Sequence, residues 1–298
     1  MVRQWAVRIV DALMTGLAQG AMIALVALGY TMVYGVLRLI NFAHGEIFMM
    51  GGYAGLFALA AIAGSTSVSP WIAALVAAAI AMLAAAALGV VVERVAYRPL
   101  RGRALGPLAR VAPLVTAIGT SVLLQNLAQL LFSPRFRPYP RLFERTRPLI
   151  VVTALAVMIG LELVVKRTWF GMAMRAVAEN EQAARLMGIP TSRVIAKTFA
   201  LGSALAALGA VLFCFDQSQV YPMMGVVIGT RAFVAAVLGG IGSIPGAMLG
   251  GLLLGVLGEL VKLTDYSGGV DVLVFLVLIG VLLVRPAGLL GATGAEKV

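Results

Sequence analysis

Long apolar stretches separated by short polar breaks follow one another along nearly the whole chain. They lie at about 12–36, 46–63, 70–92, 111–133, 148–165, 194–215, 223–241, 246–262 and 270–285. A helix of about 20 apolar residues spans the hydrocarbon core of a bilayer. The pattern therefore predicts an all-α, polytopic integral membrane protein with about eight or nine transmembrane or half-membrane helices.

The first polar break, residues 41–46, contains the only histidine of the chain. Hydrocarbon does not solvate polar groups, so such a break either leaves the membrane or lines something polar within it. We expect Asn41 to cap the next helix and Gly45 to relieve strain in the turn. The amides at that helix start would then suit a carboxylate, while His44 and Glu46 could meet an ammonium or relay a proton. The alternative is a plain interfacial loop with a helix cap.

A second break, residues 239–246, lies at the matching place in the second half of the chain and holds no ionisable group. Gly240 and Gly242 permit unusual backbone conformations, and Pro245 lacks an N–H group. Exposed amides and the Ser243 hydroxyl could coordinate a polar ligand; a tight turn is the alternative. Paired interruptions in two halves indicate a transport pathway and a broken-helix pseudo-repeat.

Glycines at GxxxG spacing follow both breaks. The pairs are Gly51 and Gly55, Gly246 and Gly250, and Gly251 and Gly255. This spacing predicts that helix backbones approach one another closely at these positions.

Composition agrees with a membrane protein, because 61% of residues are hydrophobic, 12% are charged and the mean hydropathy is +1.02. The net charge of +11 would suggest nucleic acid for a soluble protein. Here the arginines cluster between apolar spans, as membrane orientation requires, so no nucleic-acid partner is expected. Residues 1–10 lack a small-residue cleavage site and are expected to be retained. Cys214, the single cysteine, is expected to be a buried hydrophobe.

Positive charge predicts the topology. The basic stretches 93–110, which includes Arg103 and Arg110, and 166–197 should be cytoplasmic, and the uncharged stretch 65–70 external. Alternation then places the C-terminus inside and the N-terminus outside. The five arginines at positions 135, 137, 141, 145 and 147 fall on the external side, against the rule. This loop is the weakest point of the predicted topology.

Residues 175–190 predict one short amphipathic helix in the second cytoplasmic stretch. Ala176, Ala183, Leu186 and Met187 would share its apolar face. Gly188 is a natural C-cap, and Pro190 prevents continuation. A helix that projects from a membrane domain is suited to docking in a groove of a partner, although a solvated linker helix is the alternative.

Catalytic chemistry has little support. One histidine and one cysteine exclude the usual zinc clusters, and no GxxxxGK[ST] loop is present. We therefore expect no catalytic residue, no metal site and no cofactor, and the chain is not expected to be an enzyme.

Three distant motifs carry a family resemblance: residues 29–35 (GYTMVYG) with 41–46 (NFAHGE), residues 235–247 (AAVLGGIGSIPGA), and the loop 175–190. The end, 286–291 with 296–298, is also similar. Over roughly residues 12–298 the chain resembles the branched-chain amino acid ABC transporter permeases, in particular the H-type subunit. The external segment 133–148 is shorter and more basic than is usual in that family.

The resemblance implies one transmembrane permease domain, 1–298, with a cytoplasmic coupling loop at about 166–197. It also implies a bacterial inner membrane location and partners besides lipid: an M-type permease, two ATPase subunits and a periplasmic amino-acid-binding protein. ATP would drive alternating access for branched-chain or related small amino acids or amides. A stand-alone channel, or a carrier that uses His44 and Glu46 as a proton relay, is the alternative, and an intramembrane enzyme is a more remote one.

Two sets of site residues are expected. The substrate pathway would be lined or shaped by Asn41, His44, Gly45, Glu46, Gly240, Gly242, Ser243 and Pro245. ATPase coupling would involve Glu179, Asn180, Ala183, Ala184 and Gly188.

Overall fold

The computed structural model describes residues 2–62, 68–101, 111–264 and 267–291, with only the backbone at 2–6 and 267. Arg103 and Arg110 of the predicted inner basic stretch, and the terminal residues 296–298, lie outside this part. The helices are α1 (Val2–Leu37), α2 (His44–Ile62), α3 (Pro70–Val92), α4 (Ala112–Phe132), α5 (Thr146–Arg167), α6 (Trp169–Glu179), α7 (Glu181–Leu186), α8 (Thr191–Gln217), α9 (Met224–Gly239), α10 (Ile244–Lys262) and α11 (Val270–Val284).

Each of the nine predicted apolar segments coincides with a helix, and the prediction of an all-α polytopic membrane protein is confirmed. Among the described residues, seven helices are long and apolar enough to span a bilayer, whereas α9 and α11 are shorter. A π-helical turn, η1 (Glu93–Tyr97), and a 3-10 turn, η2 (Arg98–Leu100), continue α3.

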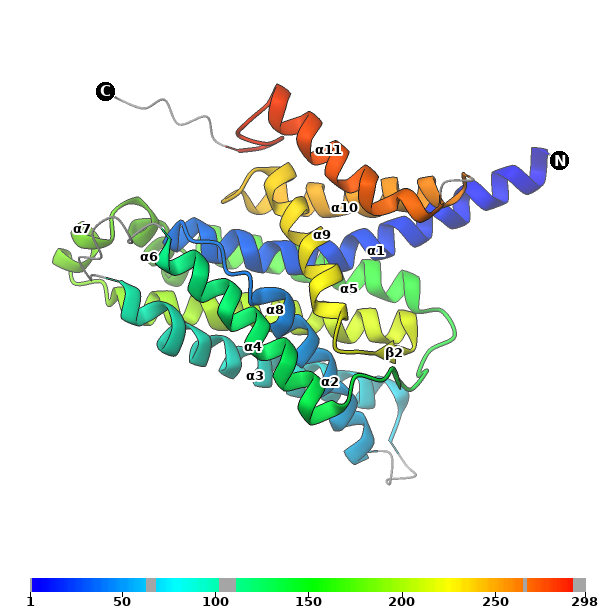
Figure 1. Ribbon diagram of the computed structural model, residues 1–298, viewed down its shortest axis with the longest axis horizontal. Coiled ribbons are helices and arrows are strands. Elements are labelled where there is room, and N and C mark those ends of the chain that lie inside the picture. Colours follow the sequence, from blue (N-terminus) through cyan, green and yellow to red (C-terminus); the bar gives the residue numbers. More distant parts are fainter. Residues whose placement is uncertain (1, 63–67, 102–110, 265–266, 292–298) are drawn as a thin grey trace.

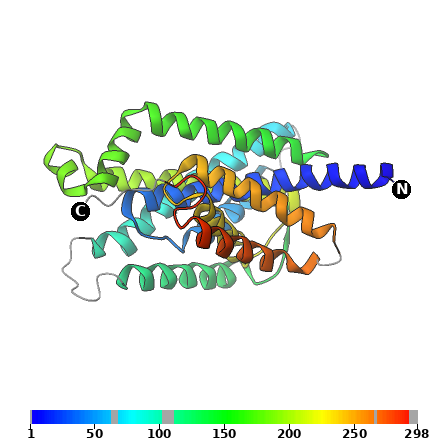
Figure 2. The ribbon, with the colours of Figure 1, turned by 90° about the horizontal axis from the view of Figure 1, so that it is seen from above.

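Helices α1 and α8 form the centre of the bundle. Helix α1 packs against α8, α9 and α10, and α2 packs against α3, α8 and α9. Helices α4 and α5 lie on opposite sides of α1 and leave most of their surface exposed (Figure 2). Their exposed residues are mainly apolar, which suits contact with lipid or with another membrane-spanning helix.

The glycine pairs bring helices close together as predicted. A Cβ atom on Gly51 would lie 2.6 Å from the Ala207 Cβ atom of α8. One on Gly251 would lie 2.6 Å from the Ala24 Cα atom of α1, and Gly255 faces Gly20 of the same helix. Close approach at small residues therefore stabilises the contacts of α2 with α8 and of α10 with α1.

The strand β1 (Arg137–Pro138) pairs antiparallel with β2 (Gln219–Val220), so that Arg137 faces Val220. The arginine-rich loop between α4 and α5 thus lies beside the α8–α9 connection, at the end of the bundle where α1 starts (Figure 1). Helices α6 and α7 lie at the opposite end. The relative placement of the loops agrees with the predicted alternation.

The single helix predicted over 175–190 is wrong. Asn180 has an extended backbone with φ −155° and separates α6 from α7. Its side-chain oxygen accepts a hydrogen bond from the Ala183 N–H group at 2.9 Å and caps α7. The shared apolar face is lost at this break, and Leu186 and Met187 are 88% and 82% exposed. The predicted end is confirmed, because Gly188 follows α7 with φ +83°.

Candidate functional site

Helix α2 begins inside the bundle. Asn41, His44 and Glu46 have at most 2% of their surface exposed. Segment 38–43 therefore carries the chain from the end of α1 back into the protein before α2 starts. An irregular backbone at membrane depth is stable only where protein or a polar cavity surrounds it.

Asn41 does not cap α2 with its side chain, and that prediction is wrong. Its Oδ1 atom accepts a hydrogen bond from the Tyr97 hydroxyl at 3.0 Å, while its backbone oxygen accepts from the His44 N–H group at 3.0 Å. The side chain is directed to η1 because a buried phenol hydroxyl needs a partner. Asn41 therefore joins the segment before α2 to η1, the turn that continues α3.

Gly45 does not relieve strain in a turn, because it lies in the first turn of α2 and does not have positive φ. A Cβ atom on Gly45 would lie 3.1 Å from the Gly229 Cα atom and still closer to the Gly225 carbonyl oxygen. The lack of a side chain is needed for the crossing of α2 with α9. The prediction names the right residue for the wrong reason.

His44 is directed toward α1. Its ring packs edge-on against Tyr30, with centroids 4.8 Å apart, and fills the space that Gly29 leaves free. His44 is not among the described residues that line the cavity beside Glu46, which is described next. His44 therefore holds the α1–α2 contact.

Glu46 lines a cavity of about 250 Å³ between α1, α2, α4 and α9. Its Oε1 atom accepts from the Ser121 hydroxyl at 3.4 Å. Its Oε2 atom is buried and has no hydrogen-bond partner among the described residues. Polar groups of Tyr30 and Thr230 and the rings of Phe42 and Phe233 complete the wall. The cavity thus combines a carboxyl group with hydroxyl and aromatic groups.

The second break is a tight, glycine-dependent turn. Gly240 and Gly242 have φ of +102° and +94°, which glycine adopts readily. The Ser243 hydroxyl accepts from the Gly246 N–H group at 3.2 Å and so caps α10, and Pro245 lies in its first turn. The Leu289 and Leu290 N–H groups donate to carbonyl oxygens of the last turn of α9 at 2.9 Å. The C-terminal turn thus packs over this break.

The two breaks do not share the Glu46 cavity in the part of the chain that the structure describes. Gly45 and Glu46 line it, while Gly242 lies beside Gly35 near the end of α1. The expected coupling residues lie together at the α6–α7 end: Glu179, Asn180, Ala183, Ala184 and Gly188. Of these, Ala184 is buried and the others are exposed.

The sequence prediction of the site does not include Ser121, Thr230, Phe233, Gly225 or Gly229. Gly225 and Gly229 have the GxxxG spacing and could have been found by it. Ser121 and Thr230 lie in apolar helices, where hydroxyl groups such as those of Thr120 and Thr230 bond to the backbone of their own helix and give no distinct signal.

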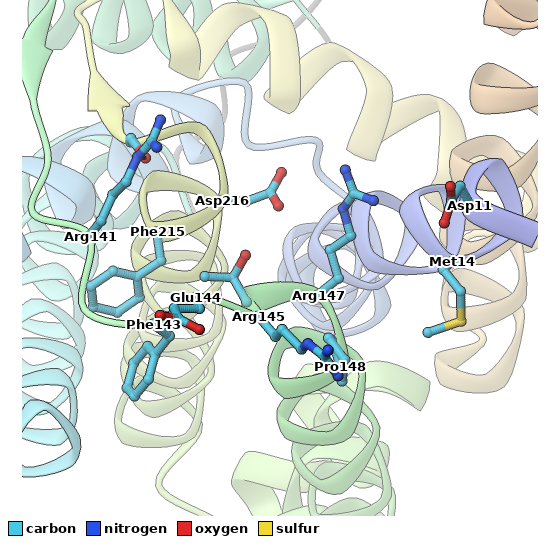
Figure 3. Close-up of a pocket in the computed structure, with 12 residues that line it drawn as sticks. Asp11, Met14, Arg141, Phe143, Glu144, Arg145, Arg147, Pro148, Phe215 and Asp216 are labelled. Atoms are coloured by element: carbon cyan, nitrogen blue, oxygen red, sulfur yellow. Dashed lines mark hydrogen bonds between the residues drawn. The ribbon is translucent and has the colours of Figure 1, made fainter. Parts of the chain in front are cut away.

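Charged side chains surround a second, wider cavity at the end where α1 starts. It has a volume of about 550 Å³ (Figure 3), and its charged lining residues are Asp11, Arg141, Glu144, Arg145, Arg147 and Asp216. The Arg141 Nε atom donates to the Ser218 hydroxyl at 2.8 Å. Burial raises the pKa of Tyr139, which packs on Phe215, so this phenol stays neutral. These contacts hold the arginine-rich loop on the end of α8.

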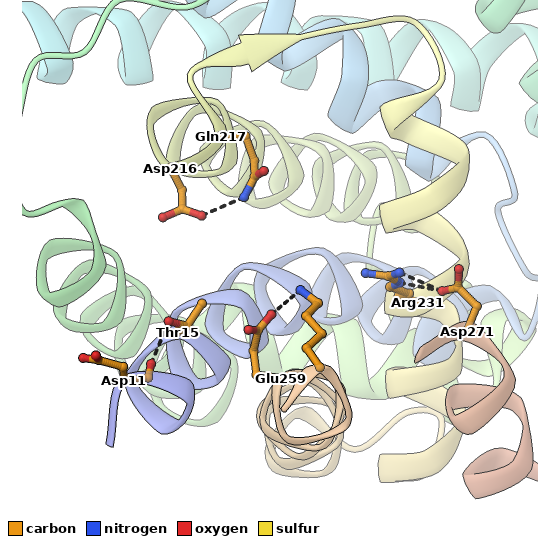
Figure 4. Close-up of polar contacts among 8 residues, drawn as sticks. Asp11, Thr15, Asp216, Gln217, Arg231, Glu259 and Asp271 are labelled. Carbon is orange, nitrogen blue, oxygen red and sulfur yellow. Dashed lines mark hydrogen bonds and ion pairs between the residues drawn. The ribbon is translucent and has the colours of Figure 1, made fainter. Parts of the chain in front are cut away.

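Two further ion pairs lie near the same end, one between helices and one within a helix (Figure 4). The Arg231 Nη2 and Nε atoms donate to Asp271 Oδ1 at 2.7 and 2.9 Å and so connect α9 to α11. Lys262 pairs with Glu259 on α10. These basic groups therefore have partners of their own and are not paired with Glu46.

Comparison with known proteins gives one consistent result. The family model described as branched-chain amino acid transport system / permease component matches residues 12–284. The high-affinity branched-chain amino acid transport system permease protein BraD of Pseudomonas aeruginosa is 43% identical over 305 residues, which cover 96% of this chain and 97% of that protein. The corresponding LivH of Escherichia coli is 41% identical over 304 residues, covering 95% and 96%. The ribose import permease protein RbsC of Bacillus subtilis is 30% identical over only 146 residues, covering 46% and 45%.

Proposed function

The chain belongs to the family of branched-chain amino acid transport permeases, and we propose that it forms the membrane pathway of an ABC importer for branched-chain or related small amino acids. The observation that carries this proposal is the identity of 41–43% to BraD and LivH over nearly the full length of all three chains. The bundle of long apolar helices is the architecture that a translocation subunit needs. The chain itself is a permease and not an enzyme.

The importer would contain partners that supply energy and substrate. We propose a second permease of the M type, two ATPase subunits and an external amino-acid-binding protein. Residues 1–298 would form a single permease domain in the inner membrane of a bacterium, with the C-terminus in the cytoplasm. ATP binding and hydrolysis would switch the permease pair between outward-facing and inward-facing states.

Coupling to the ATPases is assigned to α6 and α7. The argument rests on Leu186 and Met187, which are almost fully exposed beside the exposed residues Glu179, Asn180 and Ala183. Large apolar side chains on a short projecting helix are costly in water and are suited to a groove of a partner.

The pathway is assigned to the two breaks. Gly45 and Glu46 would line it, and Asn41 and His44 would hold the start of α2 in place. Gly240, Gly242, Ser243 and Pro245 would shape the turn between α9 and α10, which lets these helices move against the end of α1. Support comes from the burial of polar groups inside membrane-spanning helices, where such groups are costly and usually functional.

Reconstitution in liposomes tests the function. The chain, with its cognate permease, ATPases and binding protein, should take up leucine only when ATP is enclosed with the ATPases and the binding protein is present. Vesicles with a hydrolysis-deficient ATPase are the control. Uptake by this chain alone down a proton gradient would contradict the proposal and would support a proton-coupled carrier.

A further inference from the structure

From the Glu46 cavity we infer a substrate subsite: Glu46, with Ser121 and Tyr30, binds the ammonium group of an aliphatic amino acid, and Phe42 and Phe233 contact its side chain. The inference rests on the proposed function, because it assumes that an amino acid passes through this permease. It adds the chemical group that is recognised and the residues that recognise it.

The carboxyl group of Glu46 is the first reason. It is 1% exposed, its Oε2 atom has no partner among the described residues, and it forms no ion pair with any of them. A buried carboxylate without a counter-charge is expensive, and more so inside a membrane-spanning helix. A ligand cation would supply the missing partner.

The groups around Glu46 fit a primary ammonium. Such an ion has three N–H donors and needs three acceptors. Glu46 Oε2 supplies one, and the Ser121 oxygen lies 3.4 Å from the other carboxyl oxygen. The Tyr30 hydroxyl lies on the same wall, and a Cβ atom on Gly229 would lie 3.4 Å from it and 3.5 Å from the Gly45 nitrogen. Helices α1, α2 and α4 thus each contribute one acceptor.

The space for the ligand comes from glycines of α9. A Cβ atom on Gly225 would lie 2.7 Å from Glu46 Oε2, and one on Gly229 would lie 3.4 Å from the Tyr30 hydroxyl. Any larger residue would fill the cavity at the carboxyl group. Gly225 and Gly229 therefore permit the helix crossing and leave room beside Glu46 Oε2 and the Tyr30 hydroxyl.

The remaining wall is apolar. The rings of Phe42 and Phe233 lie 5.8 Å apart, and Tyr30 lies 6.1 Å from Phe233. Ile118 and Val122 of α4 form the facing side. A cavity with one acidic corner and aliphatic and aromatic walls matches a small amino acid with a branched side chain.

The cavity opens between α4 and α9, where Val122 and Thr230 are exposed. Lipid is a poor neighbour for a carboxyl and hydroxyl groups. We therefore expect this opening to face the second permease of the proposed importer and the pathway between the two subunits. Weak binding suffices there, because a substrate must also leave.

Cysteine protection tests the inference on the assembled importer in nanodiscs. Thr230→Cys in a Cys214→Ala background places a thiol at the opening. We expect leucine to slow its modification by a small polar thiol reagent about tenfold or more in at least one nucleotide state. 3-Methylbutylamine, which keeps the ammonium and side chain, should protect too, and 4-methylpentanoate, which lacks the ammonium, should not.

Glu46→Gln in the same background should abolish protection by leucine, and Glu46→Asp should retain part of it. Glu162→Gln, at a partly exposed carboxylate of α5 that is paired with Lys166, is the control and should keep full protection. If Glu46→Gln fails to assemble, Ser121→Ala replaces it and should reduce protection severalfold.

Three results would overturn the inference: equal protection by 4-methylpentanoate, full protection after loss of the Glu46 charge, or transport of leucine with no protection in any state. The last result would indicate that another group, such as a cation of the second permease, occupies the cavity. If the importer moves no leucine at all, the proposed function fails instead, so the two failures are distinguishable.

Discussion

At the scale of single residues, the start of α2 depends on a hydrogen bond between distant parts of the chain. The Tyr97 hydroxyl donates to Asn41 Oδ1 at 3.0 Å, and both residues are buried. Because water cannot replace either partner, the bond fixes where the backbone re-enters the bundle.

Tyr97→Phe should therefore destabilise the permease by about 1–3 kcal/mol, because Asn41 Oδ1 is left buried without a donor. The measurement is the thermal midpoint of the purified complex in detergent. Tyr34→Phe is the control, since the Tyr34 hydroxyl makes no hydrogen bond with a described residue and lies in a partly buried position. An equal loss in both variants would contradict the role of this bond.

Residue-scale prediction from sequence is uneven. Gly45 can be found because it interrupts an apolar pattern, and Gly188 because it follows a short helix before a proline. The Asn41 cap fails because Tyr97 lies 56 positions away and competes for the same side chain. Side-chain partners that are distant in sequence leave no local pattern.

At the scale of elements, the helices of the nine apolar segments follow directly from length and hydropathy, which are local properties. The division into α6 and α7 does not follow from these local properties, because the amphipathic pattern continues through Asn180. Only the cap that the Asn180 side chain forms on α7 shows the break. The crossing of α2 with α9 is visible in sequence only as the Gly225–Gly229 spacing. Which helix a glycine pair faces depends on the whole bundle.

The end of α7 gives an element-scale prediction. Gly188 has φ +83°, and a Cβ atom placed on it would meet no described atom within 4 Å, so a substitution there acts only through the backbone. Gly188→Val should strain the turn by about 1–2 kcal/mol and misplace Leu186 and Met187. Uptake should fall about fivefold or more while ATP hydrolysis continues.

Gly188→Asn is the matched variant, because asparagine tolerates the left-handed conformation. It should keep most of the coupled uptake. The ratio of leucine transported to ATP hydrolysed is the quantity to measure. An unchanged ratio in Gly188→Val would remove α7 from the coupling mechanism.

At the scale of the whole molecule, the loops lie at the two opposite ends of the helix bundle. The pairing of β1 with β2 places the arginine-rich loop with the α8–α9 connection, although its charge alone suggests the other side. Positive charge is a statistical guide to orientation, whereas alternation of helices is a geometric constraint. For the side of the membrane on which this loop lies, the five arginines are therefore a weaker guide than the number of membrane-spanning helices that precede it.

Labelling in cells tests the orientation. In a Cys214→Ala background, Glu144→Cys should react with a membrane-impermeant maleimide in spheroplasts, and Gln182→Cys should react only after permeabilisation. Both positions are exposed; Glu144 lies in the arginine-rich loop and Gln182 in α7, which are at opposite ends of the bundle (Figure 1). Reaction of both from the same side would contradict the fold, and an exchange of sides would reverse the proposed orientation.

The two-residue strand pair has a mechanical consequence. β2 leads through a short turn into α9, whose first turns contain Gly225 and Gly229 behind Glu46. The loop 133–145 is thus connected, through the β1–β2 pair, to the helix whose position sets the width of the Glu46 cavity. We therefore expect a protein that displaces this loop to shift the start of α9 and to change the room beside Glu46.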